Sequence, residues 1–254
     1  MVSTRKIYIR KNKTLKKPRI NPNNIPIIII CWNNLTFIKN FVNQIKEYIN
    51  PIILLDNNSS YPPLLEYYKD IKSELKDKIT IKRLNKNYGH TVYLKLKKEL
   101  PDIYILSDPD LELNKKMPAN FAEIFLQISN KYKIYKVGSA INIKDKDKFI
   151  NYVNKNGLTN YEWEKQFWRM PIKDTKYELY KADIDTTLCL VNNNYKRGNT
   201  WYFDNEAIRV AGDFTVKHLP WYKNFLKNTI PKDEIDYYKA NNKSSLTIKF
   251  LLKK

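Results

Sequence analysis

Glycine is scarce in this chain of 254 residues, which contains only five, at positions 89, 138, 157, 198 and 212. Neither Gly-x-Gly nor Gly-x-x-x-x-Gly-Lys occurs, so the dinucleotide-binding fingerprint and the P-loop are both excluded. A phosphate-binding site in such a chain has no glycine-rich loop to cradle the phosphate. Phosphate groups would therefore have to be held through a metal ion, with help from Arg or Lys side chains.

Cysteine and histidine are also scarce, with two of each. Cys31 and Cys189 fall in apolar runs that predict strands, and two buried thiols without a secretion signal argue against a structural disulfide. A zinc site would need more ligands than these four residues offer. Residues 1–26 lack the apolar core of a signal peptide, and the stretch 244–254 is too short to span a bilayer. We therefore expect a cytoplasmic protein that is neither secreted nor membrane-spanning.

Acidic residues are absent before Glu47, whereas eight basic residues lie within 1–19 and the formal net charge is +20. We expect residues 1–24 to form a basic extension. Such an arm can bind anionic lipid headgroups, with about 1 kcal/mol from each basic residue near the surface. It can also bind nucleic acid nonspecifically. Nucleic acid is the less favoured partner, because the acidic cluster described below would repel phosphate unless a metal ion intervened.

Four apolar runs in the first half of the chain predict buried strands, each followed by polar residues and, for the first three, by a helical pattern. Strands that alternate with helices favour an α/β fold, in which helices cover both faces of a parallel sheet. A smaller set of strands is expected near 133–141 and 184–192, and the length suits a single domain over 25–254. The first four strands are predicted at 25–31, 51–55, 79–84 and 103–107, and the helices at 35–45, 64–75 and 93–100.

Polar side chains follow every one of these four strands. In an open α/β sheet, ligands bind beyond the carboxyl ends of the strands, which lie at one edge when the strands are parallel. The fourth strand ends in two carboxylates one residue apart, and paired acids suit a hard divalent cation that also binds phosphate oxygens. The sequence therefore predicts a site at this edge. Its polar groups are Asn33, Asp56, Asn85, Asn87, Asp108 and Asp110.

The four strand ends, taken in order, resemble those of the nucleotide-sugar half of GT-A glycosyltransferases, close to glycosyltransferase family 2. In that family the strands end in a Tyr-Asn pair, an Asp followed by polar residues, an Asn-x-Gly loop and an Asp-x-Asp motif. The blocks 182–187 and 218–222 resemble segments of some bacterial and viral sugar transferases, so the resemblance covers roughly 25–222. The matching residues are Trp32-Asn33, Asp56-Asn57-Asn58-Ser59, Asn87-Tyr88-Gly89 and Asp108-Pro109-Asp110.

This resemblance implies a GT-A (Rossmann-like) fold, with a mostly parallel central sheet flanked by helices and a smaller C-terminal sheet on the acceptor side. Residues 25–114 would form the nucleotide-sugar half and 115–254 the acceptor half. The implied activity is transfer of a sugar from a nucleoside-diphosphate donor, with a UDP-sugar favoured, to a hydroxyl of a glycan or lipid-linked acceptor. The resemblance also implies inversion at the anomeric carbon and a requirement for Mn²⁺ or Mg²⁺.

The resemblance also assigns roles to individual residues. Asp56 would accept hydrogen bonds from the nucleotide base, and Asp108 would contact the ribose or a metal-bound water. Asp110 would ligate the metal, and His218 would complete its shell, which would favour Mn²⁺ because imidazole binds it more readily than Mg²⁺. The alternative for that histidine is a hydrogen-bonded side chain beside Trp221. Nucleotide-sugar binding is assigned to Cys31, Trp32, Asn33, Asp56, Asn58, Asn87, Gly89 and Asp108.

The catalytic base is less directly indicated, because the chain has no Glu-Asp pair where many inverting members place it. Asp183 and Asp185 lie between two predicted strands, and either could take the proton from an acceptor hydroxyl. Asp residues in turns also bond to local backbone, which is the structural alternative. We favour Asp185, with Asp183, Glu162 and Glu164 as rivals. A sugar nucleotidyltransferase is a further alternative, but that class needs a glycine-rich loop after the first strand, and residues 32–36 contain no glycine.

Overall fold

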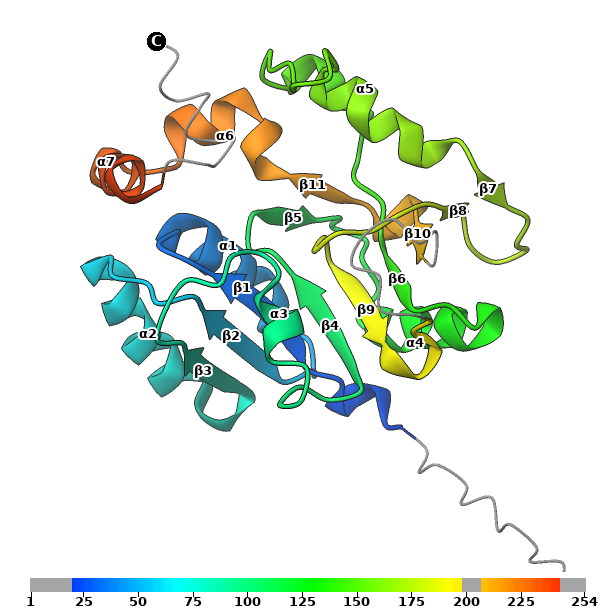
Figure 1. The fold of residues 1–254 in the computed structure, drawn as a ribbon, viewed down its shortest axis with the longest axis horizontal. Helices are drawn as coiled ribbons and strands as arrows, with labels where there is room; N and C mark the ends of the chain where they lie inside the picture. Colours follow the sequence, from blue (N-terminus) through cyan, green and yellow to red (C-terminus); the bar gives the residue numbers. More distant parts are fainter. Residues whose placement is uncertain (1–19, 198–206, 243–254) are drawn as a thin grey trace, which may run out of the picture.

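The computed structural model describes residues 20–197 and 207–242. Within them, nine strands form one sheet in the order β3-β2-β1-β4-β9-β6-β10-β8-β7, with helices on both faces (Figure 1). Strands β9 and β8 run opposite to the other seven. The predicted fold class is confirmed: a mostly parallel central sheet flanked by helices, with a small separate sheet. The basic residues of the predicted arm lie outside the described residues.

The four strands predicted in the first half are confirmed, each with bounds that shift by no more than a few residues. They are β1 (Ile27–Cys31), β2 (Ile52–Asp56), β3 (Ile79–Arg83) and β4 (Ile103–Ser107). All four are parallel, and β2 and β4 pair with opposite sides of β1. Their carboxyl ends therefore lie at one edge of the sheet.

The parallel strands are buried on both faces, which explains their continuous apolar sequences. Alternate residues of β1 contribute to two separate hydrophobic clusters. The larger cluster is covered by α1 (Leu35–Ile45), α2 (Pro62–Leu75) and α4 (Phe121–Tyr132). The smaller cluster includes residues of α3 (Val92–Lys95).

Helix α3 is shorter than the helix predicted over 93–100, because turns follow Lys95. Pro101 follows this segment, and the residue before a proline disfavours the helical region. The apolar residues of 93–100 pack in or against the smaller cluster, but only the first turn of this segment is helical.

The strands of the second half extend the central sheet. Those predicted near 133–141 and 184–192 form as β6 (Lys136–Ser139) and β9 (Cys189–Asn192), but they are not a sheet of their own. Strand β9 inserts antiparallel between β4 and β6. Gly138 permits this close pairing, since a Cβ there would lie 2.7 Å from the Leu188 carbonyl oxygen. Beyond β6 come β10 (Ala207–Val210), β8 (Leu179–Lys181) and β7 (Pro171–Ile172).

The separate small sheet consists of β5 (Leu111–Leu113) and β11 (Val216–His218), which are antiparallel. Leu111 lies opposite His218 in the register, and the Leu219 amide donates to the Asp110 carbonyl at 2.8 Å. This pairing brings a C-terminal histidine next to the Asp-x-Asp segment.

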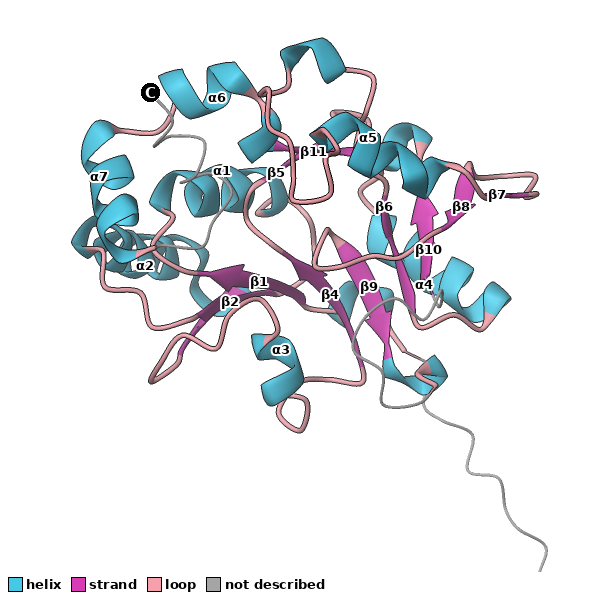
Figure 2. Ribbon diagram, turned by 45° about the horizontal axis from the view of Figure 1, so that its top comes forward, coloured by secondary structure: helices cyan, strands magenta, loops and turns pink. Residues whose placement is uncertain are grey.

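The remaining helices lie toward the carboxyl edge of the sheet (Figure 2). They are α5 (Asn160–Lys165), α6 (Lys223–Asn228) and α7 (Lys232–Asn241). In the described ranges, no helix has both the length and the apolar character needed to cross a membrane. Short 3-10 turns occur at 22–24, 76–78, 146–148, 166–168, 193–195, 212–214 and 219–221.

Candidate active site

Two adjoining cavities lie at the carboxyl edge of the sheet, and they share a wall made of Asp108, Asp110, His218 and Trp221. One has a volume of about 260 Å³, and we call it the acidic cavity because Glu164, Asp183 and Asp185 also line it. The other has a volume of about 390 Å³, and we call it the aromatic cavity because Phe37, Tyr152 and Tyr238 also line it.

Asp110 and His218, which were both predicted as metal ligands, form a close pair in the shared wall. His218 Nε2 lies 3.4 Å from Asp110 Oδ2, and about a quarter of each side chain is exposed. Asp110 Oδ1 and His218 Nδ1 are buried and have no hydrogen-bond partner in the described part of the chain. The imidazole also packs on Trp221, with ring centroids 4.8 Å apart, which is the position that the alternative for His218 predicts, although Nδ1 lacks the hydrogen bond that the alternative includes. Ring packing orients the imidazole and is compatible with binding a ligand.

Asp108 is held by the loop that precedes β9. Its backbone amide donates to the Thr186 carbonyl at 3.0 Å, and the Thr186 hydroxyl donates to its carboxylate. Burial raises the pKa of Asp108, and the negative charge of nearby Asp110 raises it further. Two neighbouring carboxylates that disfavour each other's charge would both be stabilised by a bound cation.

Asp110 and His218 could provide two of the ligands that a divalent cation needs. No group of three or more His, Cys, Asp or Glu side chains within residues 20–197 and 207–242 is arranged to hold a metal ion. Two adjacent side chains, each with a buried ligand atom that has no hydrogen-bond partner, fit a cation that takes its other ligands from a bound phosphate and water. A set of one carboxylate and one imidazole suits Mn²⁺ better than Mg²⁺.

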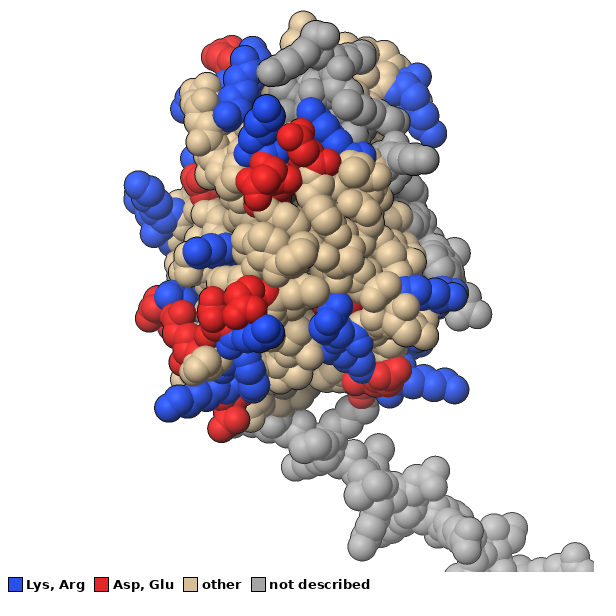
Figure 3. Space-filling model, turned by 90° about the vertical axis from the view of Figure 1, so that its left-hand side faces the viewer, with Lys and Arg blue, Asp and Glu red and all other residues tan. Residues whose placement is uncertain are grey.

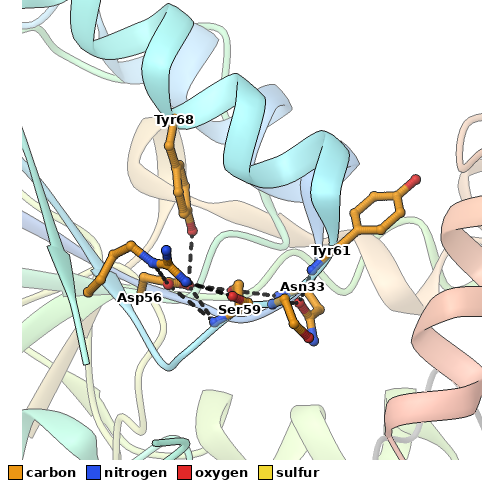
Figure 4. Close-up of polar contacts among 7 residues, drawn as sticks. Asn33, Asp56, Ser59, Tyr61 and Tyr68 are labelled. Carbon is orange, nitrogen blue, oxygen red and sulfur yellow. Dashed lines mark hydrogen bonds and ion pairs between the residues drawn. The ribbon is translucent and has the colours of Figure 1, made fainter. Parts of the chain in front are cut away.

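Asp56 lies at the centre of a hydrogen-bond network (Figure 4). Its carboxylate is fully buried and accepts from the Ser59 amide at 3.2 Å, the Ser59 hydroxyl, the Tyr68 hydroxyl at 3.2 Å and Arg83 Nε at 3.1 Å. Four donors compensate for the cost of burying a charge. These contacts fix the loop between β2 and α2. The role of Asp56 in binding the nucleotide base stays a prediction.

Asn33 connects the loop after β1 to the start of α2. It has a positive φ of 51°, and its Oδ1 accepts from the amides of Ser60 at 2.8 Å and Tyr61 at 3.0 Å. Its own amide donates to the Ser59 hydroxyl at 3.0 Å. Asn33 thereby satisfies backbone donors next to the α2 N-terminus, which is a capping role.

Cys31 and Trp32 precede Asn33 and differ in exposure. The Cys31 thiol is buried and contacts the Ile29 carbonyl oxygen at 3.5 Å, and burial raises its pKa. Trp32 is partly exposed, and its ring centroid lies 6.0 Å from that of Tyr238 in α7. Trp32 is therefore the residue of this pair with side-chain surface at the sheet edge.

The loop with Asn87 and Gly89 is tied to the end of β2 by Asn57, a residue to which no role was assigned. Asn57 Nδ2 donates to the Gly89 carbonyl at 3.1 Å, and its Oδ1 accepts from the Tyr88 amide at 3.2 Å. Asn58 and Asn87 are exposed, and Gly89 has a positive φ of 74°, which glycine adopts without strain. Among the predicted nucleotide-sugar residues, only Asp108 lines either cavity.

Asp183 and Asp185 both line the acidic cavity, and two buried cations hold their backbone. Lys136 Nζ donates to the carbonyls of Ile184 at 3.0 Å and Asp185 at 2.8 Å. Arg209 Nε donates to the Asp183 carbonyl at 2.8 Å. Sequence reasoning missed Lys136 and Arg209, although a lone basic residue within an apolar strand signals a buried partner.

Glu164 and Glu162 lie in very different environments. Glu164 is buried in the acidic cavity and paired with Arg209, and burial raises its pKa to about 7 despite that cation. Glu162 is exposed, lines neither cavity and accepts from the amide and hydroxyl of Thr159, each at 2.8 Å. These two bonds lower its pKa and form a capping box at the start of α5. We therefore retain Glu164, but not Glu162, as a rival for the catalytic base.

The raised pKa of Glu164 predicts a pH-dependent stability. Its pKa in the folded protein, about 7, exceeds the ordinary 4.5, so folding favours the protonated form. The free energy of unfolding should fall as pH rises from about 4.5 to about 7, by about 3 kcal/mol. Gln at position 164 cannot ionise. The change in the free energy of unfolding between about pH 5 and about pH 7.5, measured by urea titration, should therefore be smaller in Glu164→Gln than in the parent, by about 2 kcal/mol.

Glu162→Gln is the matched control for this measurement, because it changes an exposed acid two residues away. It should keep the fall in stability between the two pH values. An unchanged pH dependence in Glu164→Gln would contradict the buried environment of Glu164.

Comparison with known proteins identifies the fold. No model of a known protein family matches the sequence, and no curated protein sequence matches it. The structure of GalNAc-T7 with UDP, GalNAc and Mn²⁺ matches with a TM-score of 0.51 and 12% identity, over 85% of this chain and 48% of that one. The chain has a GT-A fold. It spans about half the length of GalNAc-T7.

A second similar structure is a mannosyltransferase, PcManGT from Pyrobaculum calidifontis, in complex with GDP-Man and Mn²⁺. Its TM-score is 0.45 at 13% identity, over 89% of this chain and 67% of that one. At such identities the similarity is one of fold, and the function has to be argued from the residues of this chain.

Proposed function

We propose that this protein is a metal-dependent glycosyltransferase, which moves a sugar from a nucleoside-diphosphate donor to an acceptor hydroxyl. The observation that carries the proposal is the Asp110–His218 pair in the wall between two cavities. Asp110 Oδ1 and His218 Nδ1 are buried atoms that have no hydrogen-bond partner among the described residues and could bind a metal ion. The pair lies at the edge where α/β sheets bind ligands. A donor whose diphosphate meets this wall would extend into both cavities.

The distribution of carboxylates orients the donor. Glu164, Asp183 and Asp185 line only the acidic cavity. A general base has to lie within hydrogen-bond reach of the acceptor hydroxyl, so the sugar and the acceptor would occupy that cavity. The nucleoside would then occupy the aromatic cavity. Trp163, which also lines the acidic cavity, is a candidate platform for the apolar side of a sugar, whereas the Phe167 ring lies against the Arg209 guanidinium.

Asp110 and His218 would hold the divalent cation, with Mn²⁺ preferred over Mg²⁺ for its affinity to imidazole. When bound, the cation stabilises the negative charge that develops on the leaving diphosphate. Asp108, which Thr186 holds in place, would orient the ribose or a water molecule in the shared wall. Trp221 would keep the His218 ring in position.

Asp185 is the base that we favour. It is exposed, lines the acidic cavity, and has its backbone carbonyl fixed by Lys136. Its carboxylate would accept the hydroxyl proton as the acceptor oxygen bonds to the anomeric carbon and the bond to the diphosphate breaks. Such a single displacement inverts the anomeric carbon. Asp183 and Glu164 are the rival bases.

We favour a UDP-sugar as donor and a glycan or lipid-linked acceptor, with the basic N-terminal arm on an anionic membrane. Nucleic-acid binding gains no support from the face drawn in Figure 3, where Lys and Arg side chains are interspersed with Asp, Glu and uncharged surface. A continuous basic stripe, as expected of a nucleic-acid-binding surface, is not visible among the described residues of that face.

A screen of nucleotide sugars tests the proposed function. We expect one nucleotide class to raise the melting temperature only when Mn²⁺ is present, since a ligand that binds the folded state stabilises it. The same donors should be hydrolysed slowly, with release of the nucleoside diphosphate. If no nucleotide sugar binds, and an oligonucleotide binds with a steep salt dependence, the protein is a nucleic-acid-binding protein instead.

A further inference from the structure

Helix α7 belongs to the C-terminal half of the chain. It packs on loops that follow β1 and β2 in the first half, as both ribbon views show (Figures 1 and 2). Its Glu234 is only 3% exposed, and the carboxylate accepts from the Thr36 amide at 2.9 Å and the Thr36 hydroxyl at 2.6 Å. Thr36 lies in the first turn of α1, where the N-cap residue Asn34 makes no side-chain cap. Glu234 therefore caps α1 from another helix, and its charge favours that helix end.

Two further hydrogen bonds fasten α7 to the loop after β2. The Tyr61 hydroxyl donates to Asp233 Oδ2 at 2.8 Å, and the Tyr237 hydroxyl donates to the Ser60 hydroxyl at 2.8 Å. The rings of Tyr61 and Tyr237 also pack with centroids 4.9 Å apart. Together with Glu234, these contacts make α7 a fixed wall over the ends of β1 and β2.

This wall carries Tyr238 into the aromatic cavity. Tyr238 lines that cavity together with Asp108, Asp110 and His218. Its ring also lies against Trp32, with centroids 6.0 Å apart and planes at 58°. Tyr238 thus lines the same cavity as the candidate cation ligands, and its ring packs on Trp32, which does not itself line the cavity.

We propose that Tyr238 is a donor-binding residue, whose ring, packed on Trp32, forms an aromatic wall for the nucleobase. This inference rests on the proposed function, which places the nucleoside in the aromatic cavity. The nucleobase is the planar, aromatic end of a nucleotide sugar, and stacking on aromatic side chains binds any base. The sugar end has its carboxylate partners in the acidic cavity instead.

Calorimetry with two probes tests the proposal. In the presence of Mn²⁺, Tyr238→Ala should weaken the binding of UDP or GDP by about 10-fold to 100-fold. Pyrophosphate with Mn²⁺ should bind as it does to the parent, because it has no base to stack. Tyr238→Phe keeps the ring and should bind both probes as the parent does.

Two further variants separate stacking from the docking of α7. Asp236→Ala, at an exposed position of the same helix, should bind both probes like the parent. Tyr238→Leu fills the space beside Trp32 without an aromatic face, so it should lose affinity for the nucleoside diphosphate even if Tyr238→Ala does not fold.

Three outcomes would overturn the inference. The first is parent-like binding of nucleoside diphosphates by both the alanine and the leucine variant. The second is an equal loss of pyrophosphate binding, which would show that Tyr238 acts on the site as a whole. The third is a parent protein that binds no nucleoside diphosphate, which would overturn the proposed function as well and so is distinguishable from the first two.

Discussion

Asp110→Asn is expected to abolish the Mn²⁺-dependent binding of a nucleoside diphosphate, with a loss in affinity of more than about 100-fold. Substitution of a residue that merely orients a metal ligand already costs about 10-fold to 100-fold. Asp110 is the charged partner in the Asp110–His218 pair, and a hard cation depends on that charge. The measurement is the rise in melting temperature that Mn²⁺ and UDP or GDP produce together, compared between variant and parent.

The fold should tolerate this substitution. The charge of Asp110 disfavours ionisation of Asp108, so an uncharged amide relieves a repulsion. Asp102→Asn is the matched control, because Asp102 is an exposed acid that directly precedes β4, at the end of the strand away from Asp110. This variant should keep the full ligand-induced shift in melting temperature. His218→Ala should also weaken the metal-dependent shift. Equal shifts in Asp110→Asn and the parent would show that Asp110 is not a ligand.

The first half of the fold could be predicted closely because its strands are parallel and buried on both faces. Such strands form continuous apolar runs, and polar residues mark their ends, as Asn33 does after β1 and Asp56 does at the end of β2. The second half could not be predicted as well. Its strands are short, and the antiparallel insertion of β9 between β4 and β6 depends on long-range pairing rather than on local pattern.

The candidate site shows the same division. The Asp-x-Asp segment could be placed from its strand alone, whereas the approach of His218 depends on the pairing of β5 with β11. The resemblance to GT-A glycosyltransferases implies that His218 and Asp110 lie close together, because it assigns both residues to one metal ion. The structural roles of Asn33 and Asp56 were not predicted, because a polar residue after a strand can serve either a ligand or the local backbone. Their hydrogen bonds, to the loops at the strand ends and to Tyr68 and Arg83, are visible only in the structure.

Helix α7 illustrates why an element can escape a pattern-based assignment. It buries one acidic residue, Glu234, and carries few apolar residues, so no apolar face is evident in 232–241. Polar side chains dock it on Thr36, Ser60 and Tyr61. Hydrogen bonds between helices leave no hydrophobic periodicity in the sequence. A helix docked in this way is therefore not recognised as packed against the rest of the protein.

Asp185→Asn is expected to lower kcat by about 10² to 10⁴, the usual contribution of a general base. Donor affinity should stay close to that of the parent, because the nucleoside and the diphosphate of the donor would bind outside the acidic cavity that Asp185 lines. The main-chain carbonyl that Lys136 binds is unaltered by the substitution, so the loop should keep its position. Single-turnover transfer to the acceptor, together with calorimetry of donor binding, separates the two quantities.

Asp183→Asn and Glu164→Gln are the comparison variants, and the pH profile of the parent separates Glu164 from the two aspartates. The pKa of Glu164 lies near 7, and a base acts in its ionised form, so catalysis by Glu164 would make kcat rise with pH through about 7. Glu164 is also paired with Arg209, which competes for the lone pairs that a base needs. Full transfer activity in Asp185→Asn would assign the base to Asp183, or to Glu164 if kcat also rises through neutral pH.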